Sequence, residues 1–126
     1  MSYASHPNDV RVVFAVPTGS TSQSLDFFVR ANFSGDVLSG QIREHDVVML
    51  SFRTEGFSAE DILDSVQRTV SSSTIPFAVV AVKFWFPHFN PVRYFTFSDN
   101  KFSENTEAQL RGEMVQKTPI LSNILS

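Results

Sequence analysis

The residues best suited to recognition lie between positions 77 and 98, in the stretch FAVVAVKFWFPHFNPVRYFTFS. Successive side chains of a strand point to opposite faces, which would place Lys83 and Trp85 on one face together with Tyr94. A face that combines aromatic rings with polar handles is typical of a sheet surface that a partner covers. His88 lies at the expected hairpin tip, where contact residues are common.

Arg93 falls on the opposite, apolar set of this stretch, near the start of its second strand, from which its guanidinium could reach solvent. Positions 71 to 98 contain Lys83 and Arg93 but no Asp or Glu, so the segment is positive within a chain of net charge −3. Aromatic rings beside cations form the platform on which single-stranded nucleic acid stacks its bases. We therefore predict a binding face formed by Lys83, Trp85, His88, Arg93 and Tyr94. Two other interpretations stay open: Trp85 and Tyr94 could pack under a helix or tail of the same chain, or could form a dimerisation surface.

Residue patterns for catalysis or metal binding are missing from the sequence. The absence of cysteine excludes a thiolate nucleophile and a disulfide framework. There is no Gly-x-Ser-x-Gly elbow, no glycine-rich dinucleotide or phosphate loop and no His-Glu-x-x-His helix. His45, between Glu44 and Asp46, could join a metal or acid–base site, but a solvated turn between two strands explains the same residues. We therefore expect a non-enzymatic protein without a metal site or cofactor.

The elements that must position these residues are mostly strands. Two apolar runs rich in β-branched and aromatic residues flank Pro87, Asn90 and Pro91, and this pattern predicts a β-hairpin over 77–98. Further strands are predicted at Val10–Val16, Leu25–Phe33, Val37–Arg43 and Val47–Arg53. The alternation is clearest in Leu25–Phe33, which indicates a half-buried strand with one wet face.

The pattern changes to a period of 3.6 between positions 58 and 70. Ser58 and Asp61 resemble a capping box with Asp in place of Glu, and Ile62, Val66 and Val70 lie on one apolar stripe. We therefore predict an amphipathic helix over 58–70, inserted before the hairpin.

The end of the chain is unusual because it is apolar. Asp99–Ser103 is predicted to be a turn, and Glu104–Gln116 has the composition of a helix. Beyond it, Ile120, Leu121, Ile124 and Leu125 would make a short apolar stripe. This tail either docks on its own domain or acts as an oligomer arm that packs into a neighbouring subunit.

These elements predict a single α+β domain over 1–126 that is mostly β. It would comprise a flexible arm (1–9), a β-rich core (10–98) and a C-terminal helical segment with the apolar tail (99–126). The core would be an antiparallel sheet, or a small partly open barrel, of five to six strands. The barrel alternative rests on element order alone, which is similar to that of an OB-like barrel.

The composition indicates a globular protein with more apolar surface than one thin core readily buries. Hydrophobic residues make up 42% of the 126 positions, and 13 residues are Phe against one Trp and two Tyr. Because Phe gains only from burial, oligomerisation is the simplest outlet for this apolar area. The net charge of −3 argues against strong sequence-independent binding to nucleic acid or anionic lipid. No run approaches the roughly 18 to 20 apolar residues of a membrane span, and the first residues do not resemble a signal peptide, so we expect a cytoplasmic or nuclear protein that is not secreted.

From these features we predict a non-enzymatic protein–protein interaction or self-assembly module, which forms a homo-oligomer or binds a protein partner. The alternative is a single-stranded nucleic-acid-binding module that uses the same aromatic and basic face. A small, cysteine-free, aromatic-rich chain without a recognisable motif is also typical of viral accessory or structural proteins.

Overall fold

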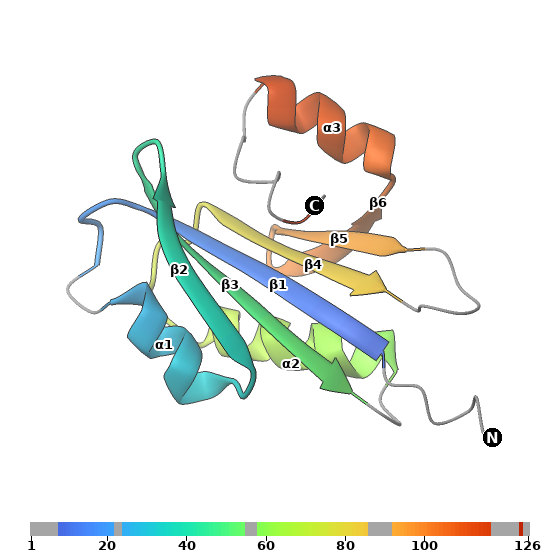
Figure 1. Ribbon diagram of the computed structural model, residues 1–126, viewed down its shortest axis with the longest axis horizontal. Helices are drawn as coiled ribbons and strands as arrows, with labels where there is room; N and C mark the ends of the chain where they lie inside the picture. Colours follow the sequence, from blue (N-terminus) through green and yellow to red (C-terminus); the bar gives the residue numbers. More distant parts are fainter. Residues whose placement is uncertain (1–7, 22–23, 55–57, 86–91, 117–123, 125–126) are drawn as a thin grey trace.

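The computed structural model describes residues 8–21, 24–54, 58–85, 92–116 and 124. Six strands and three helices occupy this part of the chain (Figure 1). In chain order they are β1 (Asn8–Pro17), α1 (Leu25–Asn32), β2 (Asp36–Ile42), β3 (His45–Thr54), α2 (Ala59–Ser71), β4 (Val79–Trp85), β5 (Arg93–Ser98), β6 (Lys101–Asn105) and α3 (Glu107–Gln116). None of the helices in these ranges has the length and apolar character needed to cross a membrane.

The strands form one open antiparallel sheet in the order β2-β3-β1-β4-β5-β6. The first six elements follow the β-α-β-β-α-β order of ferredoxin-like, or split βαβ, sheets. The strands β5 and β6 then extend the sheet beyond β4 as consecutive antiparallel neighbours. The predicted mostly β, α+β class is confirmed, and the core is an open sheet with the edge strands β2 and β6.

The helices α1 and α2 cover one face of the sheet, and we call this face the helix face (Figure 1). Its core contains the even-numbered side chains of the two central strands, Val10 to Val16 on β1 and Val80 to Phe84 on β4. Leu50 of β3 and Phe95 of β5 continue the same layer, and Phe84 and Phe95 meet edge to face with ring centroids 5.7 Å apart. The alternation read from the sequence of the hairpin therefore identified the core side correctly.

The amphipathic helix predicted over 58–70 is confirmed as α2. The Ser58 hydroxyl accepts a hydrogen bond from the Asp61 backbone N–H, and the Asp61 carboxylate accepts one from the Ser58 N–H. This reciprocal pair is a capping box, which satisfies two backbone donors at the helix start. Ile62, Val66 and Val70 are buried on the helix face.

The strand predicted over Leu25–Phe33 is wrong, because residues Leu25–Asn32 form α1. The Ser24 hydroxyl caps this helix by accepting a hydrogen bond from the backbone N–H of Phe27, 3.2 Å away. Buried Leu25, Phe28 and Val29 have the spacing of one helix stripe, whereas Phe27 is 59% exposed. Over nine residues the apolar pattern fits both periods, and the capping serine with the tertiary contacts selects the helix.

The turn predicted over Asp99–Ser103 is also wrong in part. Asp99 and Asn100 both have positive φ, 54° and 62°, which matches a two-residue hairpin turn. The chain therefore reverses within two residues, and β6 begins at Lys101 and pairs with β5. The turn predicted at Glu44–Asp46 is likewise shorter than expected, because β3 already begins at His45.

The second face, which we call the open face, is covered in part by the end of the chain (Figure 1). Leu110 of α3 and Ile124 are fully buried in a cluster with Val13, Ala15, Val47, Ala81 and Tyr94. The helix α3 lies over the side of the sheet that carries β5 and β6, and no other helix of the described residues lies over the open face (Figure 1).

Candidate functional site

The uncovered part of the open face carries a row of polar side chains that crosses four strands. The strand register places Asp36 of β2 opposite Ser51 of β3, Ser51 opposite Arg11 of β1, and Arg11 opposite Lys83 of β4. Because directly opposite residues have Cβ atoms about 5 Å apart, these four side chains form one continuous line.

A second row lies next to the first, where β1 begins and β4 ends. Asp9 stands between Arg53 and Trp85 in the register, and all three share the face of Arg11. We call the two rows together the uncovered strip; its residues are Asp9, Arg11, Asp36, Ser51, Arg53, Lys83 and Trp85.

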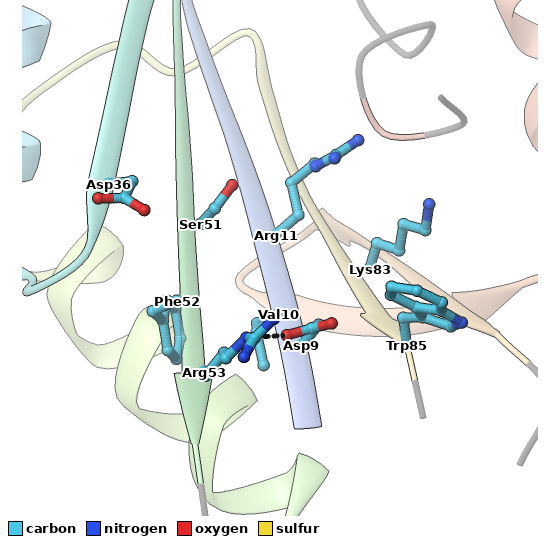
Figure 2. A pocket seen from close by; sticks show the side chains of 9 residues that line it. All are labelled: Asp9, Val10, Arg11, Asp36, Ser51, Phe52, Arg53, Lys83 and Trp85. Atoms are coloured by element: carbon cyan, nitrogen blue, oxygen red, sulfur yellow. Dashed lines mark hydrogen bonds and ion pairs between the residues drawn. The ribbon is translucent and has the colours of Figure 1, made fainter. Parts of the chain in front are cut away.

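The uncovered strip borders a hollow of about 300 Å³. Figure 2 shows Arg11 and Lys83 projecting in the same direction, with the Trp85 ring beside Lys83. Val10 and Phe52 complete the lining. The hollow is open to solvent and five of its nine lining residues are charged. This suits a contacting surface better than a buried small-molecule pocket, because such pockets are usually apolar and enclosed.

The uncovered strip carries charges of both signs. The Arg53 Nε donates to an Asp9 carboxylate oxygen 3.0 Å away, and both side chains are partly open to water. Burial lowers the pKa of Lys83, and the nearby Arg11 guanidinium lowers it further, whereas Glu107 of α3 opposes this shift. Lys83 and Arg11 therefore lie close enough to repel each other, and Lys83 would gain from an anionic or hydrogen-bonding partner.

Trp85 is the large aromatic side chain of the uncovered strip, with 48% of its surface exposed. The sequence contains a single Trp, so this ring also supplies a unique fluorescence reporter. Its indole N–H and broad apolar face make Trp a common anchor of interfaces.

Tyr94 differs from Lys83 and Trp85 in its burial, although the three side chains share a face as predicted. It is opposite Lys83 in the register and shares the open face, but it is only 6% exposed because Leu110 and Ile124 lie in the same cluster. Burial raises the pKa of the Tyr94 hydroxyl, and Glu107 raises it further. For Tyr94, the interpretation of packing under a helix and tail of the same chain is therefore the one that the structure shows.

Arg93 lies on the helix face, away from the uncovered strip. It donates two hydrogen bonds of 3.0 Å to Glu104 of β6, and its guanidinium carbon is 5.0 Å from the Phe95 ring centroid. These contacts stabilise the β5–β6 pair, and Arg93 does not join Lys83 in a common basic patch.

Four other predicted site residues lie outside the described part of the chain: His88, Ile120, Leu121 and Leu125. Their predicted roles stay predictions. Ile124 is described and is fully buried within its own chain.

Five residues of the uncovered strip were missed in the sequence, namely Asp9, Arg11, Asp36, Ser51 and Arg53. The signal was available, because Asp9 and Arg11 alternate with buried Val10 and Val12. Ser51 and Arg53 alternate in the same way with Leu50 and Phe52 of β3. The order of the strands, which brings these residues beside Lys83, has no local signal in the sequence.

The described residues contain no group of three or more His, Asp or Glu side chains that could hold a metal ion. His45, the histidine weighed for such a site, begins β3 opposite Ile42 and Pro17, and Asp46 accepts a hydrogen bond from Gln41 instead.

No protein-family model matches the sequence, and no curated protein or solved structure shows a significant match. The ferredoxin-like element order does not specify a function, because folds of this kind host many unrelated activities. The function is therefore inferred from the uncovered strip itself.

Proposed function

We propose that this protein is a non-enzymatic interaction module that binds a protein partner through the uncovered strip. The observation that carries this proposal is Trp85, which is 48% exposed beside a hollow lined by Arg11, Arg53 and Lys83. Trp and Arg are the side chains most enriched among residues that dominate interface energies. A partner that covers Trp85 would remove its apolar surface from water and leave the charged residues at the rim.

The balance of charge favours a protein over a polyanion. Arg11, Arg53 and Lys83 share the uncovered strip with Asp9 and Asp36, and Arg53 is already paired with Asp9. A partner with charges of both signs can complement such a pattern, whereas a phosphate backbone would be repelled by the two carboxylates.

The test uses site-specific photo-crosslinking in cells that express the full chain. A photoreactive residue at Ser51, within the uncovered strip, should give a defined protein adduct that is lost when Trp85→Ala or Arg11→Glu is added. The matched control carries the same photoreactive residue at Phe27, which is 59% exposed on α1 and lies on the other side of the sheet. Circular dichroism would verify that each variant is folded. Equal adducts from Ser51 and Phe27, or adducts indifferent to Trp85→Ala, would contradict the proposal.

A second function, the binding of single-stranded nucleic acid, is favoured by the proximity of two cations to Trp85. The Arg11 guanidinium lowers the pKa of Lys83, so the two positive groups lie close together beside an exposed ring. Bases could stack on Trp85 while Arg11 and Lys83 contact phosphates. Titration with single-stranded DNA and RNA should then quench Trp85 fluorescence with an affinity that falls as salt rises. Fluorescence unchanged by either oligonucleotide would dispose of this second function.

A further inference from the structure

The edge strand β2 is unprotected in a way that the other edge strand is not. It runs for seven residues, Asp36–Ile42, in an unbroken register with β3 and contains neither Pro nor Lys nor Arg. Both edge strands contact a helix, β2 with α1 and β6 with α2. The opposite edge, β6, differs because it has only five residues and carries Lys101 and Glu104. Short length, charges and cover are the usual means by which proteins protect a sheet edge from pairing. The outer backbone groups of β2 are therefore a ready template for another strand.

The side chains of β2 fit a second copy of the same strand. In an antiparallel pair centred on Ser39, Leu38 lies opposite Gly40 of the partner strand, and Gly40 lies opposite the partner's Leu38. Leu38 is 65% exposed, and nothing lies within 4 Å of the position that a Cβ on Gly40 would occupy. Both residues belong to the open face of β2, so each leucine would fill the space left by a glycine.

The charges at the ends of β2 are compatible with the same arrangement. Asp36 lies opposite Ile42 of the partner strand, next to Arg43, which occupies the turn after β2. The two Asp36 side chains are at opposite ends of the pair, so no like charges face each other. At the centre, the Ser39 hydroxyl is hydrogen-bonded to the Asp26 carboxylate of α1, which links the middle of the edge strand to the helix beneath it.

We propose that two copies of this chain pair edge to edge through β2, in antiparallel orientation about a two-fold axis at Ser39, and so form a continuous twelve-stranded sheet from two six-stranded ones. Such an interface is self-complementary, as a two-fold dimer requires. This proposal does not depend on the uncovered strip, which lies mainly on the strands farther from the edge.

The first test is the mass of the full chain in solution by light scattering. The protein should have twice the chain mass of 14.1 kDa, and Leu38→Lys should return it to the monomer mass, because the substitution places two charges within the strand pair. The matched control is Phe27→Lys, which puts the same charge at another exposed hydrophobic position and should leave the dimer intact. A full chain that is monomeric at all concentrations, or a dimer unaffected by Leu38→Lys, would overturn the proposal.

The register has its own test, since the sequence contains no cysteine. Ser39→Cys should form a disulfide-linked dimer on mild oxidation, because directly opposite Cβ atoms about 5 Å apart need to approach by only about 1 Å to reach disulfide geometry. Gln41→Cys should cross-link far more slowly, because this register offsets the two copies of position 41 by about 13 Å along the strands. Equal cross-linking at both positions would refute the register. The variants Trp85→Ala and Arg11→Glu should leave the dimer mass unchanged, so the failure of one proposal is distinguishable from the failure of the other.

Discussion

Phe14 and Phe27 place the same side chain in opposite environments. Phe14 is fully buried on the helix face, and its ring centroid lies 5.7 Å from that of Phe33 and 5.9 Å from that of Phe77. Phe27 is 59% exposed on the outer side of α1. The number of Phe residues suggested more apolar area than one core buries. The exposure of Phe27 agrees with this, because not all of the Phe side chains belong to one core.

This contrast predicts a large difference between two identical substitutions. Phe14→Ala should lower the free energy of unfolding by about 3–5 kcal/mol, because it leaves a cavity in a packed core. Phe27→Ala should change it by no more than about 0.5 kcal/mol, as expected for a surface position. Urea unfolding of both variants measures the difference, and similar losses for the two would contradict the burial of Phe14 or the helical placement of Phe27.

The Arg93–Glu104 ion pair predicts part of the pH dependence of stability. The hydrogen bonds from Arg93 lower the pKa of Glu104 in the folded protein. A carboxyl group whose folded pKa is depressed contributes stability above its ordinary pKa, and this contribution is lost as the pH falls through the folded pKa. The free energy of unfolding should thus decline in acid less steeply in Glu104→Gln than in the natural chain.

The partner variant makes the pH prediction specific. Arg93→Gln should reduce the acid dependence as much as Glu104→Gln does, and the double variant should reduce it no further, because both substitutions remove the same interaction. Thermal unfolding across the acid range provides the measurement. Additive effects of the two substitutions would mean that the hydrogen bonds between Arg93 and Glu104 are not the cause.

At the scale of elements, α1 depends on the capping residue before it as well as on its apolar stripe. The Ser24 hydroxyl supplies the cap, and Asp26 at the helix start pairs with Arg30 one turn later at 2.5 Å. An eight-residue helix is too short to be stable alone, so caps and packing against β2 and β3 must hold it.

Ser24→Ala should therefore cost about 1 kcal/mol of unfolding free energy, the usual effect of removing an N-cap hydroxyl. Ser20→Ala is the matched control, because Ser20 is an exposed loop residue whose backbone N–H donates to the Pro17 carbonyl. Amide hydrogen exchange of residues 27 to 29 would locate the loss in α1. If these residues formed a strand, as the alternation suggested, Ser24→Ala would not change their amide exchange rates. Unchanged exchange would therefore contradict the helix.

At the scale of the whole molecule, the two faces of the sheet are covered unequally. Two helices that lie between strands in the chain cover the helix face, whereas the open face receives its partial cover from α3 and Ile124, which follow the last strand. The helix α3 and Ile124 thereby divide the open face into a buried part around Tyr94 and the solvent-exposed uncovered strip.

A chain that ends at Lys117 should consequently be less stable, because it lacks Ile124, whose side chain is fully buried. Removal of one buried Ile typically costs about 2–5 kcal/mol. A chain that ends at Ile124 keeps this side chain and serves as the control. Denaturant unfolding compares the two, and equal stability would mean that Ile124 contributes little to the cover of Tyr94. If the β2 edge mediates dimerisation, both truncated chains should remain dimers.

The sequence by itself determined most of the elements and the faces of their side chains, but not α1 or β6. Consecutive residues show a hydrophobic period of two in 77–98 and of 3.6 in 58–70. The hairpin and the helix were therefore predictable, and so was the shared face of Lys83, Trp85 and Tyr94. Period alone failed for Leu25–Phe33, where nine residues fit both patterns.

The tertiary structure decided which residues became neighbours and which part of each face is covered. Arg11 comes between Ser51 and Lys83 through the strand order β3-β1-β4. Tyr94 is buried because Ile124, thirty residues later, packs in the same cluster. Local periodicity reports the direction in which a side chain points, but strand pairing and the docking of the chain end join residues far apart in sequence, and they depend on the packing of the whole domain.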